Sequence, residues 1–402
     1  MNQTPNAIHD SEHTRRRTWA EIDLDAGIHN FEAVRHATSA KVCCVIKANA
    51  YGHGAIDLAR LYERIGADFL AVSNIEEALQ IRQNSVHLPI LILGYTPAKC
   101  AALLAANNIS QCVYSKDYGQ ALAKAAEEAG VRVRIHLKLD TGMGRIGFAF
   151  RGDGHDELED ALAVCACDSL IREGIFTHFA VADEGIEGKA YTDRQFTCFL
   201  RAIDTLSAHG YTFTLRHCAN SAAIFAYPEY HLDMVRAGVV LYGLAPSEAV
   251  SVPSLRPMMT LKTVVSHIKT IHEGESVSYG RRFTADHEQK VATVPIGYAD
   301  GFFRANSCGA YALLISGRKA PILGRVCMDQ IMLNADGIDC KPDDEVIVFG
   351  AEPGSTAADL AAAAGTIHYE IICAVGERVP RAYLQNGSVV SWADHIWSGN
   401  EQ

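Results

Sequence analysis

The sequence lacks the features of a membrane protein or a nucleic-acid-binding protein. No apolar run is long enough to cross a bilayer, because Asp359 and Glu370 interrupt the Ala-rich stretch near the end. The basic run near the start is followed by Glu21, Asp23 and Asp25, and not by the apolar segment of a signal peptide. Basic residues are outnumbered, with 36 Lys and Arg against 47 Asp and Glu. The net charge of −11 argues against a nucleic-acid footprint, so we expect neither a membrane nor a nucleic-acid partner.

The cysteines also lack a pattern. There are 12, and none forms a C-x-x-C pair, which argues against a zinc ribbon or a thioredoxin-like motif. Many unpatterned cysteines without an export signal are typical of reduced thiols. The sequence therefore predicts a cytoplasmic protein without a metal site, in which most cysteines are small buried residues.

The chain has 402 residues, too many for one ordinary core. From about residue 23 to 240, short apolar runs alternate with helical segments. The runs are KVCCVIK, DFLAVS, PILILG, SQCVYS, VRVRIHLKLD, LIREGIFTHFA, TLRHCANS and DMVRAG. Such alternation is typical of parallel βα units, and eight units close a (β/α)8 barrel. A doubly wound open sheet stays possible. A capping box of Ser73 and Glu76 is expected to begin one helix.

After about residue 250 the pattern changes to strand-like runs with turn signals between them. They are TLKTVVSHIKTI, QKVATVPIGYA, YALLISGRKAPILG, DQIMLNA and DEVIVFG, and one helix is expected near TAADLAAAAG, before IHYEIICAV. The sequence thus predicts an α/β fold of two domains. Residues 12–250 form a TIM-type barrel, and residues 251–390 form a mostly β C-terminal domain.

Polar side chains gather at the expected C-terminal ends of five barrel strands, where the reactive groups of such barrels sit. They are Lys47 with Tyr51, then Lys138, Asp140 and Arg145, then Thr177 and His178, then Asn220 and Ser221, and finally Arg236 with Gly238. This mostly cationic or neutral set suits a phosphate. A lysine among other cations is favoured in its neutral form, which can form an imine with an aldehyde. A phosphate site beside such a lysine suggests pyridoxal 5'-phosphate.

Several motifs carry a family resemblance from about residue 18 to 385. In order they are VIKANAYGHG, LDTGMGRIGF, THFAVAD, CANSAAIF, RAGVVLYGLAPS, SYGRRF, IGYADGFFR, GRVCMDQIM and IHYEII. Together they resemble the bacterial alanine racemases, which are fold-type III pyridoxal-phosphate enzymes. The resemblance implies a homodimer with shared active sites that interconverts L-alanine and D-alanine by two-base racemisation. It also implies that the product supplies peptidoglycan precursors.

The resemblance implies a role for each matched residue. Lys47 would hold the cofactor as an imine and act as one base, and Tyr279 of the partner subunit would be the base on the opposite face. Arg236 would hydrogen-bond the pyridine nitrogen. The full set expected at the cofactor is Lys47, Tyr51, Arg145, His178, Asn220, Ser221, Arg236, Gly238, Val239 and Tyr369. Arg145 and the backbone amide of Met328 would bind the substrate carboxylate, and Tyr298 would narrow the entrance with Tyr279 and Tyr369.

Some alternatives stay open. A fold-type III decarboxylase shares the barrel and the lysine, but it does not need the second base that Tyr279 supplies. A non-catalytic carrier of the cofactor would normally lack the second domain. A broad-spectrum or serine racemase is the closest rival, although the bulky Tyr369 favours alanine. Lys138 is matched by a carbamylated lysine in some members of the family. For Lys138 and Tyr298, structural and functional interpretations weigh equally.

Overall fold

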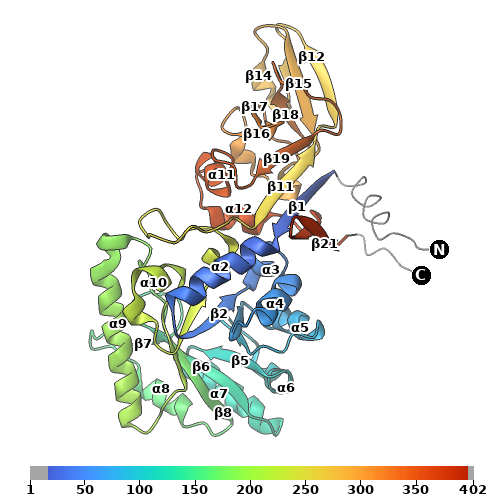
Figure 1. Ribbon diagram of the computed structural model, residues 1–402. Coiled ribbons are helices and arrows are strands. Elements are labelled where there is room, and N and C mark those ends of the chain that lie inside the picture. Colours follow the sequence, from blue (N-terminus) through green and yellow to red (C-terminus); the bar gives the residue numbers. More distant parts are fainter. Residues whose placement is uncertain (1–16, 397–402) are drawn as a thin grey trace, which may run out of the picture. The chain divides into compact units, whose positions relative to one another are not determined.

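The computed structural model describes residues 17–396, which form two compact units (Figure 1). One unit spans Ala26–Arg256, and the other joins the described residues up to Asp25 to those from Pro257 onward. Strand β1 (Thr18–Asp23) belongs to this second unit, whereas the sequence placed it in the barrel domain of residues 12–250. The physical reason is that β1 pairs antiparallel with β11 (Met259–Val264) and parallel with β20 (Arg381–Gln385). Residues 12–16 lie outside the described part.

The first unit is a barrel of parallel strands. They are β2 (Lys41–Val45), β3 (Phe69–Val72), β4 (Ile90–Ile92), β5 (Ile109–Val113), β6 (Val133–Asp140), β8 (Leu170–Phe176), β9 (Leu215–His217) and β10 (Met234–Ala237). Their order is β10-β2-β3-β4-β5-β6-β8-β9, and the short β7 (Phe148–Ala149) pairs with β6. The Asp233 amide donates to the Arg216 carbonyl at 3.1 Å and the Arg236 amide to the Ala219 carbonyl at 3.0 Å, which joins β9 to β10. The predicted barrel is confirmed, and each predicted strand is present.

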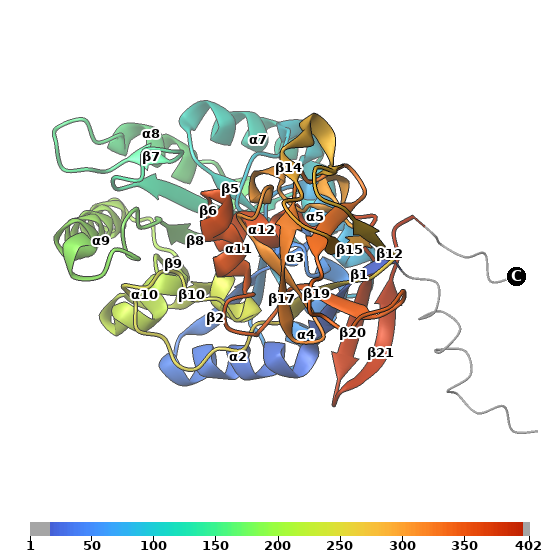
Figure 2. The ribbon, with the colours of Figure 1, turned by 90° about the horizontal axis from the view of Figure 1, so that it is seen from above.

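Helices cover the outside of this barrel, with α2, α7 and α9 around the strands in Figure 2. The helical elements are α2 (Leu24–Ala37), α3 (Lys47–Tyr51), α4 (Ala55–Arg64), α5 (Ile75–Gln83), η1 (Ala98–Cys100), α6 (Ala101–Ala106), α7 (Lys116–Glu128), α8 (Leu158–Cys165), α9 (Gly185–Ala208), α10 (Ser221–Ala226), η2 (Pro228–Tyr230) and η3 (Val239–Tyr242). Alternate strand residues build a buried cluster, for example Cys43 with Val45 and Phe69 with Ala71. This period of two is what a strand imposes on a barrel core.

The second unit is mostly β, as predicted. Its long sheet has the order β12-β15-β18-β17-β16-β19-β11-β1-β20-β21. The elements not yet given are β12 (His267–Ile271), β13 (Ser276–Val277), η4 (Tyr279–Arg281), β14 (Phe283–Thr284), β15 (Gln289–Val294), η5 (Tyr298–Asp300), η6 (Arg304–Asn306), β16 (Ala312–Ile315), β17 (Arg318–Leu323), β18 (Ile331–Asn334), β19 (Glu345–Phe349), α11 (Ala357–Ala364), α12 (His368–Ala374) and β21 (Ser388–Ala393). Helix α11 is the predicted helix, and α12 was not predicted.

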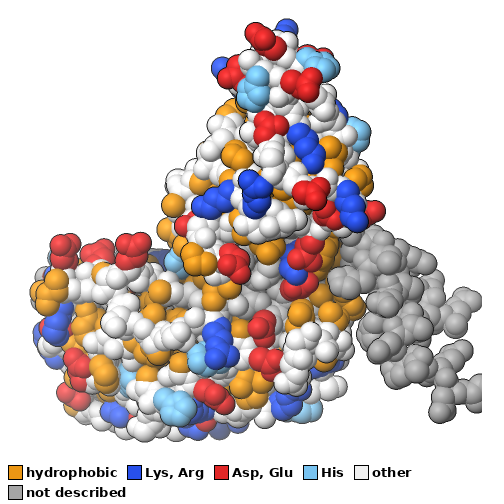
Figure 3. All heavy atoms as spheres, turned by 45° about the horizontal axis from the view of Figure 1, so that its top comes forward, with side chains coloured by type: hydrophobic (Ala, Val, Ile, Leu, Met, Phe, Trp, Pro, Cys, Tyr) orange, Lys and Arg blue, Asp and Glu red, His pale blue; other side chains and the backbone are white. Residues whose placement is uncertain are grey.

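The apolar length of the helices and the distribution of surface charge can be compared with the expectation of neither a membrane nor a nucleic-acid partner. Among residues 17–396, no helix is both long and apolar enough to cross a membrane. On the face drawn in Figure 3, acidic and basic side chains are interspersed. A mixed distribution of this kind differs from the clustered Lys and Arg of a nucleic-acid footprint.

The cap of helix α5 lies one residue from its predicted position. Asn74 is the N-cap, and its side-chain oxygen accepts a hydrogen bond from the Glu77 amide at 2.9 Å. The predicted pair of Ser73 and Glu76 is therefore wrong. The Glu77 carboxylate instead accepts the Ser73 amide at 2.7 Å and the Ala48 amide at 2.6 Å. The helix start is thus tied to the chain that leaves strand β2.

Replacing the cap should separate the two assignments. We expect Asn74→Ala to lower the free energy of unfolding by about 1 kcal/mol, because an orphan amide at the helix start loses its acceptor. Ser73→Ala is the matched control and should change it by less than about 0.5 kcal/mol. Urea unfolding followed by circular dichroism measures both, and a larger loss for Ser73→Ala would contradict the observed cap.

Candidate active site at the barrel mouth

Lys47 leaves the barrel on an unusual turn. It follows β2 and begins α3, in which Ala48, Asn49 and Ala50 have φ of 53° and Tyr51 has φ of 52°. A left-handed conformation costs a residue with a side chain about 1–2 kcal/mol. Four such residues in a row persist only where their surroundings hold them, and strain of this kind is common at functional sites.

Two side chains hold this turn. The Glu77 carboxylate accepts the Ala48 amide, and the Asn49 side-chain oxygen accepts the Ala55 amide at 2.8 Å. Within the turn, the Gly52 amide donates to the Ala48 carbonyl at 3.0 Å. The turn therefore fixes Lys47 and Tyr51 at the end of the first barrel strand, where the sequence placed them.

Tyr51 and Ser221 form a cradle around Gly238. The Gly238 amide donates to the Ser221 hydroxyl at 2.8 Å. A Cβ on Gly238 would lie 3.1 Å from the Tyr51 hydroxyl and 3.5 Å from the Ser221 Oγ, so the glycine keeps this space open. Two hydroxyls beside an open backbone suit the oxygens of a phosphate. The Tyr51 ring packs on Tyr242 with 4.8 Å between centroids.

Asn220 and Val239 flank this cradle. The Asn220 side chain caps α10 by accepting the Ala223 amide at 3.0 Å, and so it orients the helix that begins at Ser221. Val239 is buried and begins η3 directly after Gly238. Their expected cofactor contacts stay predictions.

Arg236 is the centre of the polar contacts inside the barrel. It is 4% exposed. Its guanidinium donates to the Thr177 carbonyl at 2.9 Å and to His178 Nδ1 at 3.2 Å. Burial lowers the pKa of His178 well below its ordinary value, and the charges that add to this effect are those of Arg236, Lys138, Arg145 and Lys47. Of the predicted cations of the barrel, Arg236 therefore contacts the imidazole directly, and the other three add to the electrostatic effect that keeps it neutral.

A chain of hydrogen bonds leads from Arg236 across the barrel. Arg236 donates to His217 Nδ1 at 2.9 Å, and His217 Nε2 lies 2.9 Å from His136 Nδ1. His136 Nε2 lies 3.1 Å from the Glu173 carboxylate. Burial lowers the pKa of both His136 and His217. Two neutral imidazoles therefore each accept on Nδ1 and donate on Nε2, so the chain of donors runs from the guanidinium to the carboxylate.

This chain was missed by sequence reasoning. The available signal was polar residues at inward positions of strands that are otherwise apolar, as His136 is on β6 and His217 on β9. Gly174 belongs to the same arrangement, because a Cβ there would lie 2.4 Å from His136 Nδ1. Phe176 stacks on His217, with 4.9 Å between ring centroids and an interplanar angle of 3°.

Lys138 is a buried amine at the same mouth. It is 3% exposed, and its Nζ donates to the Leu139 carbonyl at 2.7 Å. Burial lowers the pKa of Lys138 to about 7, with Arg236 and Arg145 acting in the same direction. Arg145 follows a loop held by Asp140, whose carboxylate accepts the Gly142 and Gly144 amides at 3.0 Å each.

The remaining predicted residues lie in the second unit. Tyr279 on η4 is 70% exposed and Met328 is 52% exposed. They line a surface pocket of about 440 Å³ together with Ser278, Cys327, Asp329, Gln330 and Met332. Tyr298 lies on η5, and Tyr369 on α12. The structure thus brings the predicted barrel residues to one mouth and puts Tyr279, Tyr298, Met328 and Tyr369 in the other unit.

Comparisons with known proteins match both units. Residues 22–246 match the family model for the alanine racemase N-terminal domain, and residues 258–383 match the model for its C-terminal domain. An alanine racemase of Desulfovibrio desulfuricans is 44% identical over 378 residues, covering 92% of this chain and 99% of the relative.

Solved structures agree. The alanine racemase of Clostridium difficile 630 is 40% identical with a TM-score of 0.89, covering 95% of this chain and 99% of that one. That of Bacillus anthracis with bound L-Ala-P is 34% identical with a TM-score of 0.89, covering 95% and 98%. The chain therefore has the two domains of a barrel isomerase, with a parallel barrel followed by a mostly β unit. The chain belongs to the alanine racemase family.

The buried amine should leave a signature in stability. In the unfolded chain Lys138 keeps its proton up to its ordinary pKa of 10.5, whereas in the folded chain the pKa is about 7. Between these values the unfolded state binds more protons, so the free energy of unfolding gains up to about 1.4 kcal/mol per pH unit from this residue. Lys138→Met should remove that contribution. The stability of Lys138→Met relative to the parent is therefore expected to be greatest below pH 7 and to fall as the pH rises.

Urea unfolding at several pH values from 7 to 10 measures this difference. Lys124→Met is the control, because the Lys124 side chain is 78% exposed. A pH dependence of stability that is the same for Lys138→Met and Lys124→Met would show that Lys138 is not buried as a neutral amine.

Proposed function

We propose that this enzyme interconverts L-alanine and D-alanine with pyridoxal 5'-phosphate held at the barrel mouth. The observation that carries the proposal is the polar cluster at the barrel mouth, where the buried Arg236 guanidinium donates to His178 Nδ1 at 3.2 Å and the Lys138 amine is buried. The open cradle at Gly238 adds a place for the phosphate. When bound, the cofactor withdraws electrons from the amino acid and makes its Cα proton acidic. The product would supply peptidoglycan precursors.

Each group at the mouth has a task that its chemistry suits. The Lys47 amine would hold the cofactor, since neighbouring cations favour a neutral amine that can react with an aldehyde. The hydroxyls of Tyr51 and Ser221, the amides at Gly238 and Val239, and Tyr369 would hold the phosphate. Arg236 would donate to the pyridine nitrogen. A guanidinium keeps its proton, so the ring nitrogen stays neutral and the electron withdrawal is moderate. Return of the proton to Cα is then favoured over side reactions.

Racemisation removes a proton from one face of Cα and delivers a proton to the other, which two bases on opposite faces accomplish directly. Lys47 would serve one face and Tyr279 the other. Arg145 and the Met328 amide would bind the substrate carboxylate and hold Cα between them. Because Tyr279 and Met328 lie in the second unit, we propose that they come from the partner subunit of a homodimer.

The main alternative is a racemase that also accepts serine. The bulky Tyr369 supports alanine, because a larger substrate needs space near the entrance. A decarboxylase would not need Tyr279 as a second base. The many cysteines without a spacing pattern support a reducing compartment and hence the cytoplasm.

A panel of amino acids tests the reaction. We expect the purified protein with pyridoxal 5'-phosphate to racemise alanine at least about tenfold faster than serine, a difference of about 1.4 kcal/mol in the barrier. Circular dichroism follows the loss of optical activity, and trapping of carbon dioxide runs in parallel. Release of carbon dioxide, or equal rates for alanine and serine, would replace the proposal by one of the alternatives.

Borohydride should abolish activity by fixing the cofactor to Lys47, and Lys138→Ala should leave that attachment intact.

Mixing two inactive variants tests the shared site. Lys47→Ala and Tyr279→Phe should each be inactive in racemisation, because each lacks one base. In a mixed dimer, one site would combine Lys47 of one chain with Tyr279 of the other. After unfolding and refolding in equal amounts, activity should return to about a quarter of the parent value, since half the dimers are mixed and each has one intact site. If both bases come from the same chain, no activity returns.

A further inference from the structure

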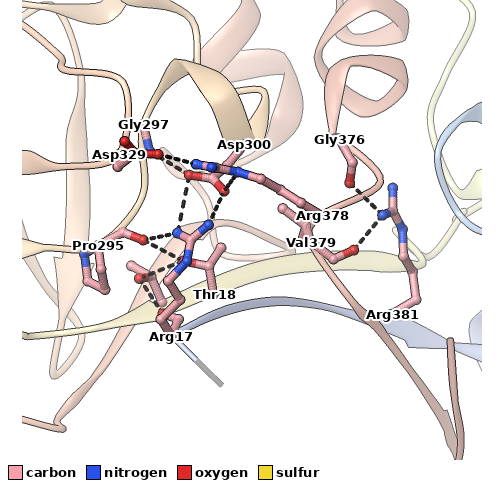
Figure 4. A network of polar contacts seen from close by, with 11 residues as sticks. Arg17, Thr18, Pro295, Gly297, Asp300, Asp329, Gly376, Arg378, Val379 and Arg381 are labelled. Carbon is pink, nitrogen blue, oxygen red and sulfur yellow. Dashed lines mark hydrogen bonds and ion pairs between the residues drawn. The ribbon is translucent and has the colours of Figure 1, made fainter. Parts of the chain in front are cut away.

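Several segments of the second unit are held together by one buried carboxylate, that of Asp300 at the end of η5 (Figure 4). Its side chain is 0% exposed. Asp300 Oδ1 accepts from Arg17 Nη2 at 2.6 Å and from Arg378 Nε at 2.8 Å. Asp300 Oδ2 accepts the Gly297 amide at 2.9 Å. Burial alone would raise the pKa of Asp300, but Arg17, Arg378 and the Gly297 amide outweigh it and hold the pKa below its ordinary value.

The Arg378 guanidinium also binds a second carboxylate. Its Nη2 donates to Asp329 Oδ1, as Figure 4 shows. Asp329 directly follows Met328, and Asp300 lies two residues after Tyr298. One guanidinium therefore connects the loop that carries Met328 to the turn that carries Tyr298. Charge-assisted hydrogen bonds from a planar guanidinium fix geometry as well as contributing energy.

The turn and the loop also meet through their backbones. The Tyr298 amide donates to the Cys327 carbonyl and the Ala299 amide to the Met328 carbonyl, each at 3.1 Å. A Cβ on Gly297 would lie 2.3 Å from both carbonyl oxygens, so no side chain fits there. The peptide groups around Met328 are thus held on the carbonyl side, and Arg378 anchors the residue that follows.

Arg378 lies in a segment that several hydrogen bonds hold in place. The Gly376 amide donates to the Asp300 carbonyl at 3.1 Å. Arg381 is 1% exposed and donates to the Gly376 carbonyl at 2.7 Å and the Val375 carbonyl at 2.7 Å. This segment follows α12, the helix that carries Tyr369. Three segments, each with one residue expected at the active site, therefore meet at Asp300.

We propose that Arg378 is a positioning residue for the substrate carboxylate. By bridging Asp300 and Asp329, it sets the direction of the Met328 amide, and it holds the Tyr298 turn against the same loop. This inference rests on the proposed function, in which the Met328 amide binds that carboxylate. The Met328 side chain is half exposed at the rim of its pocket, so packing does little to hold this loop, and the ion pair supplies the anchor.

Arg378→Gln tests the proposal in the full-length enzyme with its cofactor. Asp300 keeps Arg17 and the Gly297 amide in this variant, so the fold should persist. We expect KM for alanine to rise about tenfold while kcat changes less than about threefold, because an interaction with the bound substrate is lost. Propionate, which keeps only the carboxylate end of alanine, should bind about tenfold more weakly. Ethylamine, which lacks the carboxylate, should inhibit as it does in the parent enzyme.

Two variants complete the experiment. Arg378→Lys keeps the charge but reaches the two carboxylates less well, so it should restore part of the KM. Lys262→Gln is the matched control, because Lys262 also bridges two carboxylates, Glu21 and Glu345, at 2.9 Å each. It should leave KM and propionate binding unchanged.

The results separate this inference from the proposed function. An unchanged KM in Arg378→Gln, with the parent and Lys262→Gln both racemising alanine, overturns the role of Arg378 alone. Equal weakening of propionate and ethylamine also overturns it, since the disturbance is then not confined to the carboxylate. If the parent enzyme does not racemise alanine, the proposed function fails first.

Discussion

A buried guanidinium is the constraint on which the barrel site depends. Removing a charge from water is costly unless it is paired and hydrogen-bonded. Within residues 17–396, the Arg236 guanidinium donates to carbonyl oxygens and imidazole nitrogens and does not pair directly with a carboxylate. Two neutral histidines connect Arg236 to the Glu173 carboxylate through hydrogen bonds. Glu173 also pairs with Arg134 at 3.4 Å and accepts from Ser110, so the carboxylate is held at both oxygens.

This arrangement fixes more than one charge. Burial lowers the pKa of His178 and of Lys138 and so favours their neutral forms, and the charge of Arg236 acts in the same direction. Neutral groups beside a permanent cation leave a mouth that attracts anions. The glycine at 174 and the ring of Phe176 keep the two histidines in register.

Much of the fold was predictable because it is local in sequence. Barrel strands such as β3 and β4 are continuous apolar runs, and polar residues such as Lys47 and His178 follow the ends of other strands. The rest depended on contacts that sequence does not display. β1 precedes the barrel in the sequence, yet its partners are 237 to 245 residues away in β11 and 361 residues away in β20. The true cap of α5 is Asn74, and what distinguishes it from Ser73 is the hydrogen bond that its side chain accepts from the Glu77 amide.

The site residues divide in the same way. Residues at strand ends were found, whereas Glu173 and His136 lie within strands, where a polar residue is more often exposed than buried. Arg378 lies in a loop without a motif, and its importance comes from Asp300 and Asp329, which are 78 and 49 residues away in sequence. Positioning residues of this kind contact other protein groups and not a ligand, so no spacing rule reveals them.

The division of the candidate bases between two units has a chemical reason. The side chains at a barrel mouth all come from strand ends that surround one axis, so they approach a bound ligand from the barrel side. A second base on the opposite face of Cα must then come from another body. In the barrel, the left-handed turn after Lys47 is a strained conformation that neighbouring side chains hold. In the β unit, the buried Asp300 carboxylate and its partners hold the segments around Tyr298 and Met328. Hydrogen bonds within each unit hold these segments in place, which is what two bases would need if each is to act on its own face of one carbon atom.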